Sequence, residues 1–194
     1  AGTSIEQSNG ASTDAAVFLN DRLWLTEALS VIGSYRLDRY AAQLDSLTFA
    51  NVASRLKVKS TLKSPRASLV FELDETQTYY FSWGKAASPI GTSVVGSPTP
   101  ISSVAQSALK PDKSESLELG AKVSLFDGGL GLSGALFSQT KSNALQVDPV
   151  SGAVLLQSSP PHRVHGFEGQ ESGEVLPHLT FTASSTYLNP VIVS

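Results

Sequence analysis

Apolar and polar residues alternate along much of the chain, whereas the spacing of an amphipathic helix is scarce. The clearest stretch is residues 116–125, where Leu117, Leu119, Ala121, Val123 and Leu125 alternate with polar residues or glycine. Such alternation is typical of a β-strand with one apolar face. It predicts eight strands, at residues 13–25, 28–41, 62–73, 77–86, 114–125, 129–141, 161–173 and 178–188.

The connections between these strands alternate between short and long. Short turns recur roughly every 50 residues, near Thr26-Glu27, Asp74–Thr76, Asp127–Gly129 and Glu174-Val175. The intervening segments 42–61, 87–113 and 142–160 are rich in Ser, Pro, Thr and Gly, and we expect them to be long loops. The polar residues 1–12 are expected to form part of an outer loop as well. Short turns on one side and long loops on the other are typical of transmembrane β-barrels.

The predicted fold class is all-β, with about eight antiparallel strands of a transmembrane β-barrel arranged as four hairpins. Ten residues at about 3.4 Å each, tilted by about 45°, rise roughly 24 Å, which is close to the apolar band of such barrels. Both ends of the chain are predicted to lie on the outer side, so we expect an arc of a larger barrel. Two alternatives remain open: a self-contained eight-stranded barrel with a structural or adhesion role, whose interior side chains would fill, and a soluble β-sandwich.

Composition excludes several other classes of protein. The 194 residues include no cysteine, which excludes disulfides, zinc–thiolate sites and thiol catalysis. A net charge of −3 provides no basic surplus for nucleic acid. Residues 86–109 are uncharged and long enough to cross a membrane as a helix, but Pro89, Pro98, Pro100 and about ten Ser, Thr and Gly residues within them favour a loop.

Six segments resemble barrel strands of TonB-dependent siderophore receptors. They include GSYRLDRY at residues 33–40, SPRASLVF at 64–71 and LKPDKS at 109–114, together with residues 13–21, 125–137 and 163–168. The order and spacing of the six segments match that family over most of residues 13–190. We therefore identify residues 1–194 as a single β-barrel segment from the middle of such a receptor, with the plug domain and C-terminal strands absent.

The resemblance implies an outer-membrane receptor that takes up a ferric siderophore and is energised through TonB. In that family an N-terminal plug fills a barrel of about 22 strands. The expected partners are a ferric siderophore, outer-membrane lipid and, through the absent plug region, the TonB complex. The ferric siderophore would be the transported ligand, so we expect no cofactor and no catalytic residue. The protein is not expected to be an enzyme.

Four residues are candidates for contact with the ligand: Trp83, Arg55, Lys57 and His162. Trp83 could stack on an aromatic chelator, although aromatic residues near strand ends more often form interface girdles. Arg55 and Lys57, with Arg39 and Lys59, could attract an anionic chelate, or could form a solvated or lipopolysaccharide-facing surface.

A metal site at His162, Arg163, His165 and Glu168 is not expected. His162 and Arg163 are neighbours on a strand, so their side chains point to opposite faces and cannot converge on one ion. His162 lies beside Pro160-Pro161 at a loop exit. Gly128-Gly129 is interpreted as a hairpin turn and not as a phosphate-binding loop, and no serine lies in a nucleophile elbow.

Overall fold

The computed structural model describes residues 7–47, 53–89, 110–144, 146–147, 154–155, 161–176 and 178–192. Eight of its strands form one antiparallel sheet in the order β1-β2-β3-β4-β5-β6-β9-β10, and β7 and β8 form a separate small ribbon. Their bounds are β1 Gln7–Trp24, β2 Leu29–Leu47, β3 Ala53–Glu72, β4 Gln77–Ser88, β5 Asp112–Leu125, β6 Leu130–Ser142, β7 Gln146–Val147, β8 Val154–Leu155, β9 His162–Leu176 and β10 Leu179–Ile192. All eight predicted strands of the main sheet are therefore confirmed.

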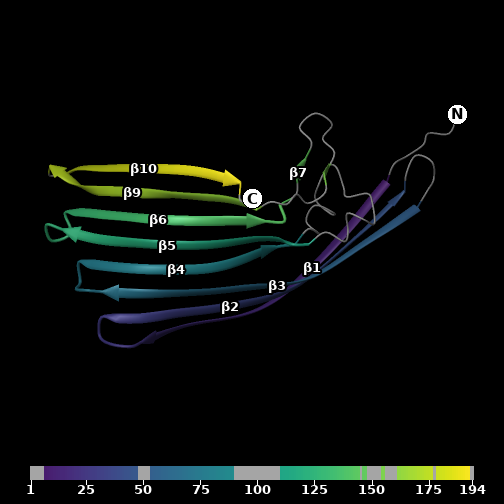
Figure 1. Cartoon of the computed structure of the whole chain (residues 1–194), viewed down its shortest axis with the longest axis horizontal. Coiled ribbons are helices and arrows are strands. Elements are labelled where there is room, and N and C mark those ends of the chain that lie inside the picture. The colour runs from purple at the N-terminus through teal and green to yellow at the C-terminus, as the bar shows by residue number, and fades with distance from the viewer. Residues whose placement is uncertain are drawn as a thin grey trace.

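The short turns gather at one end of the sheet, which we call the turn end, and the opposite end is the loop end (Figure 1). Each turn is held by local polar contacts or by special backbone angles. In the β3–β4 turn, Asp74 Oδ1 accepts hydrogen bonds from the Thr76 amide at 2.8 Å and the Thr76 hydroxyl at 2.6 Å. In the β5–β6 turn, Gly128 has a φ of 93°, a conformation that glycine adopts at little cost.

The turn between β9 and β10 lies later than the sequence predicted. Residues Glu174 and Val175 belong to β9, which runs to Leu176, and Leu176 pairs with Leu179 of β10. The residue between them that the structure describes, His178, has a φ of 70°. Glu174, where the turn was predicted, still pairs with Thr180, and its carboxylate accepts a hydrogen bond from the His178 amide at 2.9 Å.

Two segments predicted as loops are strands. Of residues 1–12, residues 7–12 belong to β1; and within 42–61, β2 continues to Leu47 and β3 begins at Ala53. Figure 1 shows β1, β2 and β3 continuing together well beyond the loop ends of the other strands. The prediction was wrong for 42–61 because the apolar residues there face the opposite side from those of the strands below, and wrong for 7–12 because these polar and small residues show no apolar alternation. The loops predicted at 87–113 and 142–160 lie largely outside the described residues.

The two faces of the sheet differ in chemistry along most of its length. The cross-strand register places one set of side chains on an apolar face: Val17, Leu19, Leu69, Phe71, Tyr79, Phe81, Leu117, Leu119, Leu136, Phe167 and Tyr187. The opposite, polar face carries Arg22, Ser30, Arg36, Arg66, Glu72, Tyr80, Glu118, Lys122, Glu168, Thr182 and Ser184. The apolar face is uncovered, since Leu19 is 72% exposed and Leu119 is 56% exposed.

At the loop end of β2 and β3 the chemistry of the two faces is exchanged. On the side continuous with the polar face, the side chains are apolar and buried: Tyr40, Ala42, Leu44, Val58 and Leu62. On the side continuous with the apolar face, they are charged or polar: Arg39, Gln43, Asp45, Arg55, Lys57, Lys59 and Lys63. We call this part of the hairpin, residues 39–47 and 53–63, the outer ribbon. The side of the outer ribbon that is continuous with the apolar face, which we call its outward face, is suited to contact with water. The apolar face of the sheet below it is suited to an apolar medium.

Pairing between β3 and β4 stops earlier than pairing on either side of them. Its last pair toward the loop end is Arg66–Gly84, whereas β2–β3 pairing continues to Leu47–Ala53 and β4–β5 pairing to Ser88–Asp112. The outer ribbon therefore separates from β4 at this level (Figure 1). A cavity of about 370 Å³, which we call the notch, lies there and is lined by residues of β3, β4, β5 and β6.

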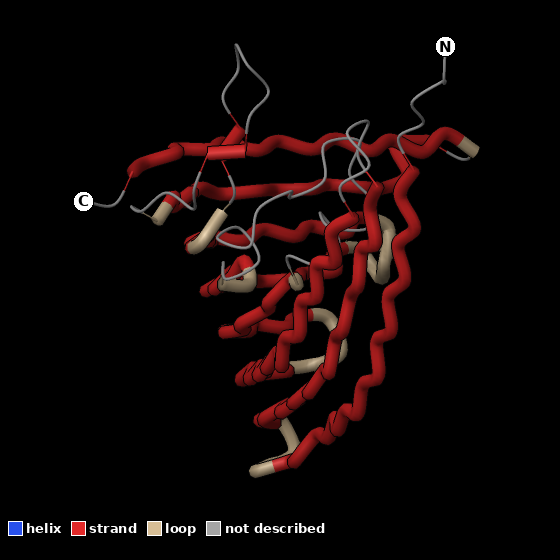
Figure 2. Tube along the Cα trace, turned by 90° about the vertical axis from the view of Figure 1, so that its right-hand side faces the viewer, coloured by secondary structure: helices blue, strands red, loops and turns tan. Residues whose placement is uncertain are grey.

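The main sheet is twisted and open (Figure 2). Among the described residues, β1 pairs with β2 alone and β10 with β9 alone, so the sheet is not the closed eight-stranded barrel that the sequence left open. The described part of the chain also has no second large sheet packed on the first, as a β-sandwich requires. None of the described residues belongs to a helix that could cross a membrane.

Candidate functional site

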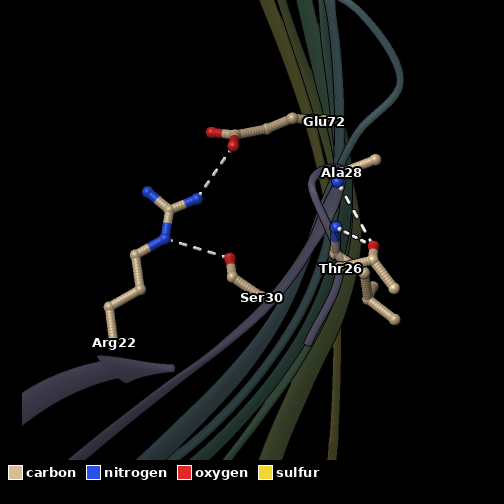
Figure 3. A network of polar contacts seen from close by, with 6 residues as sticks. Arg22, Thr26, Ala28, Ser30 and Glu72 are labelled. Carbon is tan, nitrogen blue, oxygen red and sulfur yellow. Dashed lines mark hydrogen bonds and ion pairs between the residues drawn. The ribbon is translucent and has the colours of Figure 1, made fainter. Parts of the chain in front are cut away.

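The polar face is tied together at the turn end by one arginine. Arg22 of β1 donates from Nε to the Ser30 hydroxyl of β2 at 3.0 Å, and its Nη2 lies 3.0 Å from Glu72 Oε2 of β3 (Figure 3). Its guanidinium carbon also lies 4.0 Å from the centroid of the Trp24 ring. Ser30 is fully buried. These contacts join three neighbouring strands through side chains in addition to their backbone ladders.

Nearer the loop end, the polar face of β1–β3 is hollowed by a cavity of about 570 Å³. Arg36 donates to Asp38 Oδ1 from Nε at 2.8 Å and from Nη2 at 2.6 Å, so the buried Asp38 is paired within its own strand. Arg66 also lines this cavity and is exposed. No hydrogen bond or ion pair joins Arg66 to the described part of the chain. The hollow thus offers a guanidinium that an anionic ligand could bind.

A second polar cluster lies over β4, β5 and β6. The Tyr80 hydroxyl donates to Glu118 Oε1 at 2.6 Å, and the Tyr80 ring crosses Gly120 so closely that a Cβ at residue 120 would collide with it. Beside this ring is a hollow of about 370 Å³ that Lys122, Glu168 and Gln170 help to line. The polar face therefore carries charges of both signs along its length.

The structure places Trp83 away from the polar face. Trp83 follows Tyr79 and Phe81 on the apolar face and pairs with Leu117. Its Nε1 donates to Glu115 Oε1 at 2.8 Å, and the Lys85 ammonium lies 5.5 Å from the ring centroid. This amphipathic setting suits an interface aromatic, and contact between Trp83 and a chelator stays a prediction.

Arg55 and Lys57 lie on the outward face of the outer ribbon. Arg55 Nε lies 2.6 Å from Asp45 Oδ1, and Gln43 Nε2 donates to the other carboxylate oxygen at 2.8 Å. The Arg55 hydrogen bond, followed by that of Gln43, holds the pKa of Asp45 below its usual range. Lys57 is exposed and pairs with Gln43 in the ladder. These two cations are near each other and separate from Trp83.

His162 is the first residue of β9, where it pairs with Lys141 and is half-buried. Arg163 occupies the other face and donates from Nε to the Thr140 hydroxyl at 3.1 Å. The described residues contain no group of three or more metal-ligating side chains close enough to hold an ion. The four predicted candidates thus lie in three separate places: Trp83 on β4, Arg55 and Lys57 on the outer ribbon, and His162 at the start of β9. The sequence analysis did not predict the hollow at Arg66. The alternation of Ser64, Arg66 and Ser68 with Pro65 and Ala67 was the signal that could have placed Arg66 there.

Comparison with known proteins identifies the kind of sheet this is. Residues 2–191 match the family described as TonB dependent receptor-like, beta-barrel. The chain belongs to this family. It is therefore an outer-membrane barrel segment, and the uncovered apolar face is the lipid-facing face of a TonB-dependent receptor. The polar face is correspondingly its lumen side.

Three relatives illustrate the match. The ferric-pyoverdine M114 receptor PbuA of Pseudomonas sp. (strain M114) is 31% identical over 171 residues, which are 86% of this chain and 20% of that protein. The metal-pseudopaline receptor CntO of Pseudomonas aeruginosa is 26% identical over 187 residues, 93% of this chain and 25% of that protein. The crystal structure of the siderophore receptor PiuA from Acinetobacter baumannii superposes with a TM-score of 0.81 at 23% identity, over 95% of this chain and 26% of that one. The chain spans about a fifth to a quarter of the length of these relatives.

Proposed function

We propose that this chain serves in a receptor that binds a ferric siderophore and carries it across the outer membrane, energised through TonB. The observation that carries the proposal is the 31% identity over 171 residues to a protein named as a ferric-pyoverdine receptor. The antiparallel sheet with one lipid-facing and one polar face supports it, because such a wall can enclose a polar path. Transport of this kind involves binding and conformational change without covalent chemistry.

Within this function, the polar hollow at Arg66 is the place among the described residues that is best suited to contact a chelate. Arg66 is exposed, faces the lumen and borders the Arg36–Asp38 pair. Ferric chelates that carry carboxylate or catecholate oxygens are negatively charged, and a guanidinium binds such oxygens in a bidentate manner. Arg55 and Lys57 would attract the same anion from solution, while Trp83 and His162 remain candidates for contact near the loop end.

Uptake by iron-starved cells tests the proposal. Cells lacking the gene, and cells in which it is restored, are given a panel of siderophores loaded with radioactive iron, with and without a functional TonB. We expect one siderophore whose uptake requires both the gene and TonB. If no siderophore in a panel covering hydroxamate, catecholate and carboxylate types depends on the gene, ferric siderophore uptake is not its function.

The role of Arg66 is tested in the same assay with Arg66→Gln. We expect weaker binding of the cargo, by about tenfold, because a charge-assisted bidentate contact is lost. Arg163→Gln is the matched control, since Arg163 is an exposed arginine on the lipid-facing face. Equal binding by both variants would assign the cargo contacts to other residues.

A second candidate is uptake of a chelate of another metal. The relative CntO is named as a metal-pseudopaline receptor rather than as a ferric one. Repeating the uptake assay with zinc, nickel and copper chelates distinguishes the two: dependence on the gene for one of these metals, and not for iron, would favour the second candidate.

A further inference from the structure

Two cavities meet where β3 separates from β4. The hollow at Arg66 lies on the lumen side of the wall, whereas the charged residues that line the notch lie on the opposite side. Leu62 and Ala87 line both cavities. These two side chains therefore form the boundary between a space inside the wall and a space outside it.

No β3–β4 ladder crosses this boundary. The last pair toward the loop end is Arg66–Gly84, and both Leu62 and Ala87 lie beyond it. Paired strands lie about 4.8 Å apart, and their backbone hydrogen bonds leave no room for a solute to pass between them. At Leu62 and Ala87 the wall is closed by side chains instead.

The closure is small and apolar. Leu62 is 5% exposed although it borders two cavities, and Ala87 of β4 is half-buried. An apolar constriction between two polar spaces excludes water and ions while it is narrow. Neither side chain carries a hydrogen-bonding group, so a small separation of β3 from β4 would open the constriction without breaking a polar contact between them.

Positive charge predominates at the outer end of the constriction. The charged residues that line the notch are Lys63, Lys85, Lys113 and Glu115. Glu115 lies 3.4 Å from the Lys85 ammonium, whereas Lys63 and Lys113 have no ion-pair partner among the described residues. Lysine and arginine side chains at the mouth of a pore favour anions.

The inner end of the constriction also offers a cation. Arg66 lies on the same face of β3 as Leu62 and is exposed in the hollow. Asp38 pairs with Leu62 in the ladder, but its carboxylate already accepts two hydrogen bonds from Arg36. The other carboxylate of the hollow, Asp14, lies two strands away on β1. An anion thus finds a positive charge on both sides of Leu62.

We propose that Leu62 and Ala87 gate a side passage through which small inorganic anions move between the Arg66 hollow and the medium outside the wall. At this level the outward face of the outer ribbon is polar, so the passage opens to water and not to hydrocarbon. The passage is a property of the wall and does not depend on which cargo the receptor carries.

The reaction rate of a thiol placed in the hollow measures the passage. Ser64 lines the hollow and not the notch, so Ser64→Cys is introduced into the full-length receptor in the outer membrane of intact cells. The cells are treated with an anionic thiosulfonate, 2-sulfonatoethyl methanethiosulfonate, and mass spectrometry follows modification of the peptide that contains residue 64. Adding Leu62→Gly should raise the rate about tenfold, because a positively charged opening concentrates anions. Adding Ala87→Leu, which fills the constriction, should lower it.

Val58→Gly is the matched control for Leu62→Gly. Val58 is also 5% exposed on the inner side of the outer ribbon, but it lines neither cavity. Adding Val58→Gly to Ser64→Cys should leave the rate unchanged. A cationic thiosulfonate of similar size should gain less from Leu62→Gly than the anionic one does, and Lys63→Gln with Lys113→Gln should remove this difference.

Four outcomes would overturn the proposal. They are an equal gain from Val58→Gly and Leu62→Gly, no gain from Leu62→Gly, no loss from Ala87→Leu, and equal gains for the anionic and cationic reagents. A heat-modifiable gel band shows that each variant is folded.

Discussion

At the scale of single residues, Gly120 is a position on the polar face that the structure restricts to glycine. Its neighbour across the ladder, Tyr80, lies flat over it and donates to Glu118. Only a residue without a Cβ leaves room for this ring. Glycine here serves close packing of an aromatic side chain, because its φ is not in the left-handed region.

Gly120→Ala should therefore displace the Tyr80 ring and break its hydrogen bond to Glu118. We expect a loss of about 1.5–3 kcal/mol of unfolding free energy, the usual value for a hydrogen bond to a charged group. Urea unfolding in detergent measures it. Gly33→Ala is the control, because a Cβ at residue 33 would meet no atom within 4 Å. In a Tyr80→Phe background the cost of Gly120→Ala should shrink, and an unchanged cost would contradict this account.

Asp45 links stability of the outer ribbon to pH. Its hydrogen bonds to Arg55 and Gln43 lower its pKa in the folded state. A lowered pKa means that the ionised form stabilises the fold above the unfolded-state pKa, and that this contribution is lost as pH falls through the folded-state pKa. The outer ribbon should accordingly open more readily in acid.

Hydrogen exchange of peptides from the outer ribbon measures this effect. After correction for intrinsic exchange, protection should fall between neutral pH and about pH 2. At both pH values, Asp45→Asn should show the lower protection that the unsubstituted protein shows in acid. Asp74→Asn should leave the pH dependence of the outer ribbon intact, since Asp74 lies in a turn at the opposite end of the sheet. A pH response that persists in Asp45→Asn would assign it to another group.

At the scale of elements, the contact of Arg22 with Glu72 links β1 to β3 across β2, which carries Ser30 (Figure 3). Both charged side chains are about one-third exposed. Coupling between Arg22→Gln and Glu72→Gln in a double-mutant cycle should thus stay below about 1 kcal/mol and weaken in high salt. Arg163→Gln with Glu72→Gln should be additive. A coupling several times larger would show that the pair is shielded from water in the assembled receptor.

The strands themselves could be predicted from the sequence because their alternation is strong. In residues 114–125 every second residue from Leu117 onward is apolar, and the observed β5 begins two residues earlier and ends at the same residue. The outer ribbon was mistaken for a loop because its apolar residues face inward and its charged residues outward, the reverse of the strands below. Leu56 and Val58 alternating with Arg55, Lys57 and Lys59 were the signal available.

The candidate site was less predictable for a related reason. Because every second residue of a strand lies on the same face, the sequence shows which residues share a face. How far the pairing between two strands extends depends on the neighbouring strands. The Arg66 hollow and the notch both follow from the end of β3–β4 pairing at Arg66–Gly84, which no local pattern encodes. Trp83 shows the same limit, since its position near a strand end was predicted but its bond to Glu115 depends on the β4–β5 register.

At the scale of the whole molecule, the faces and ends of the sheet define its orientation in the membrane. The outer ribbon should face the medium and the short turns the periplasm. The 194 residues contain no cysteine, so a single introduced cysteine is the one thiol within them. Lys59→Cys should react with a membrane-impermeant maleimide on intact cells, and Glu75→Cys only after the outer membrane is permeabilised. Labelling of both on intact cells would contradict this orientation.

The early end of β3–β4 pairing also has a mechanical consequence. Above Arg66–Gly84, the outer ribbon keeps its ladder with β1 on one side and has no ladder with β4 on the other. It is a cantilever, and a load on its tip produces its largest bending moment at that pair. Pulling on the tip should therefore load the β3–β4 ladder first at Arg66–Gly84, the pair where that ladder ends.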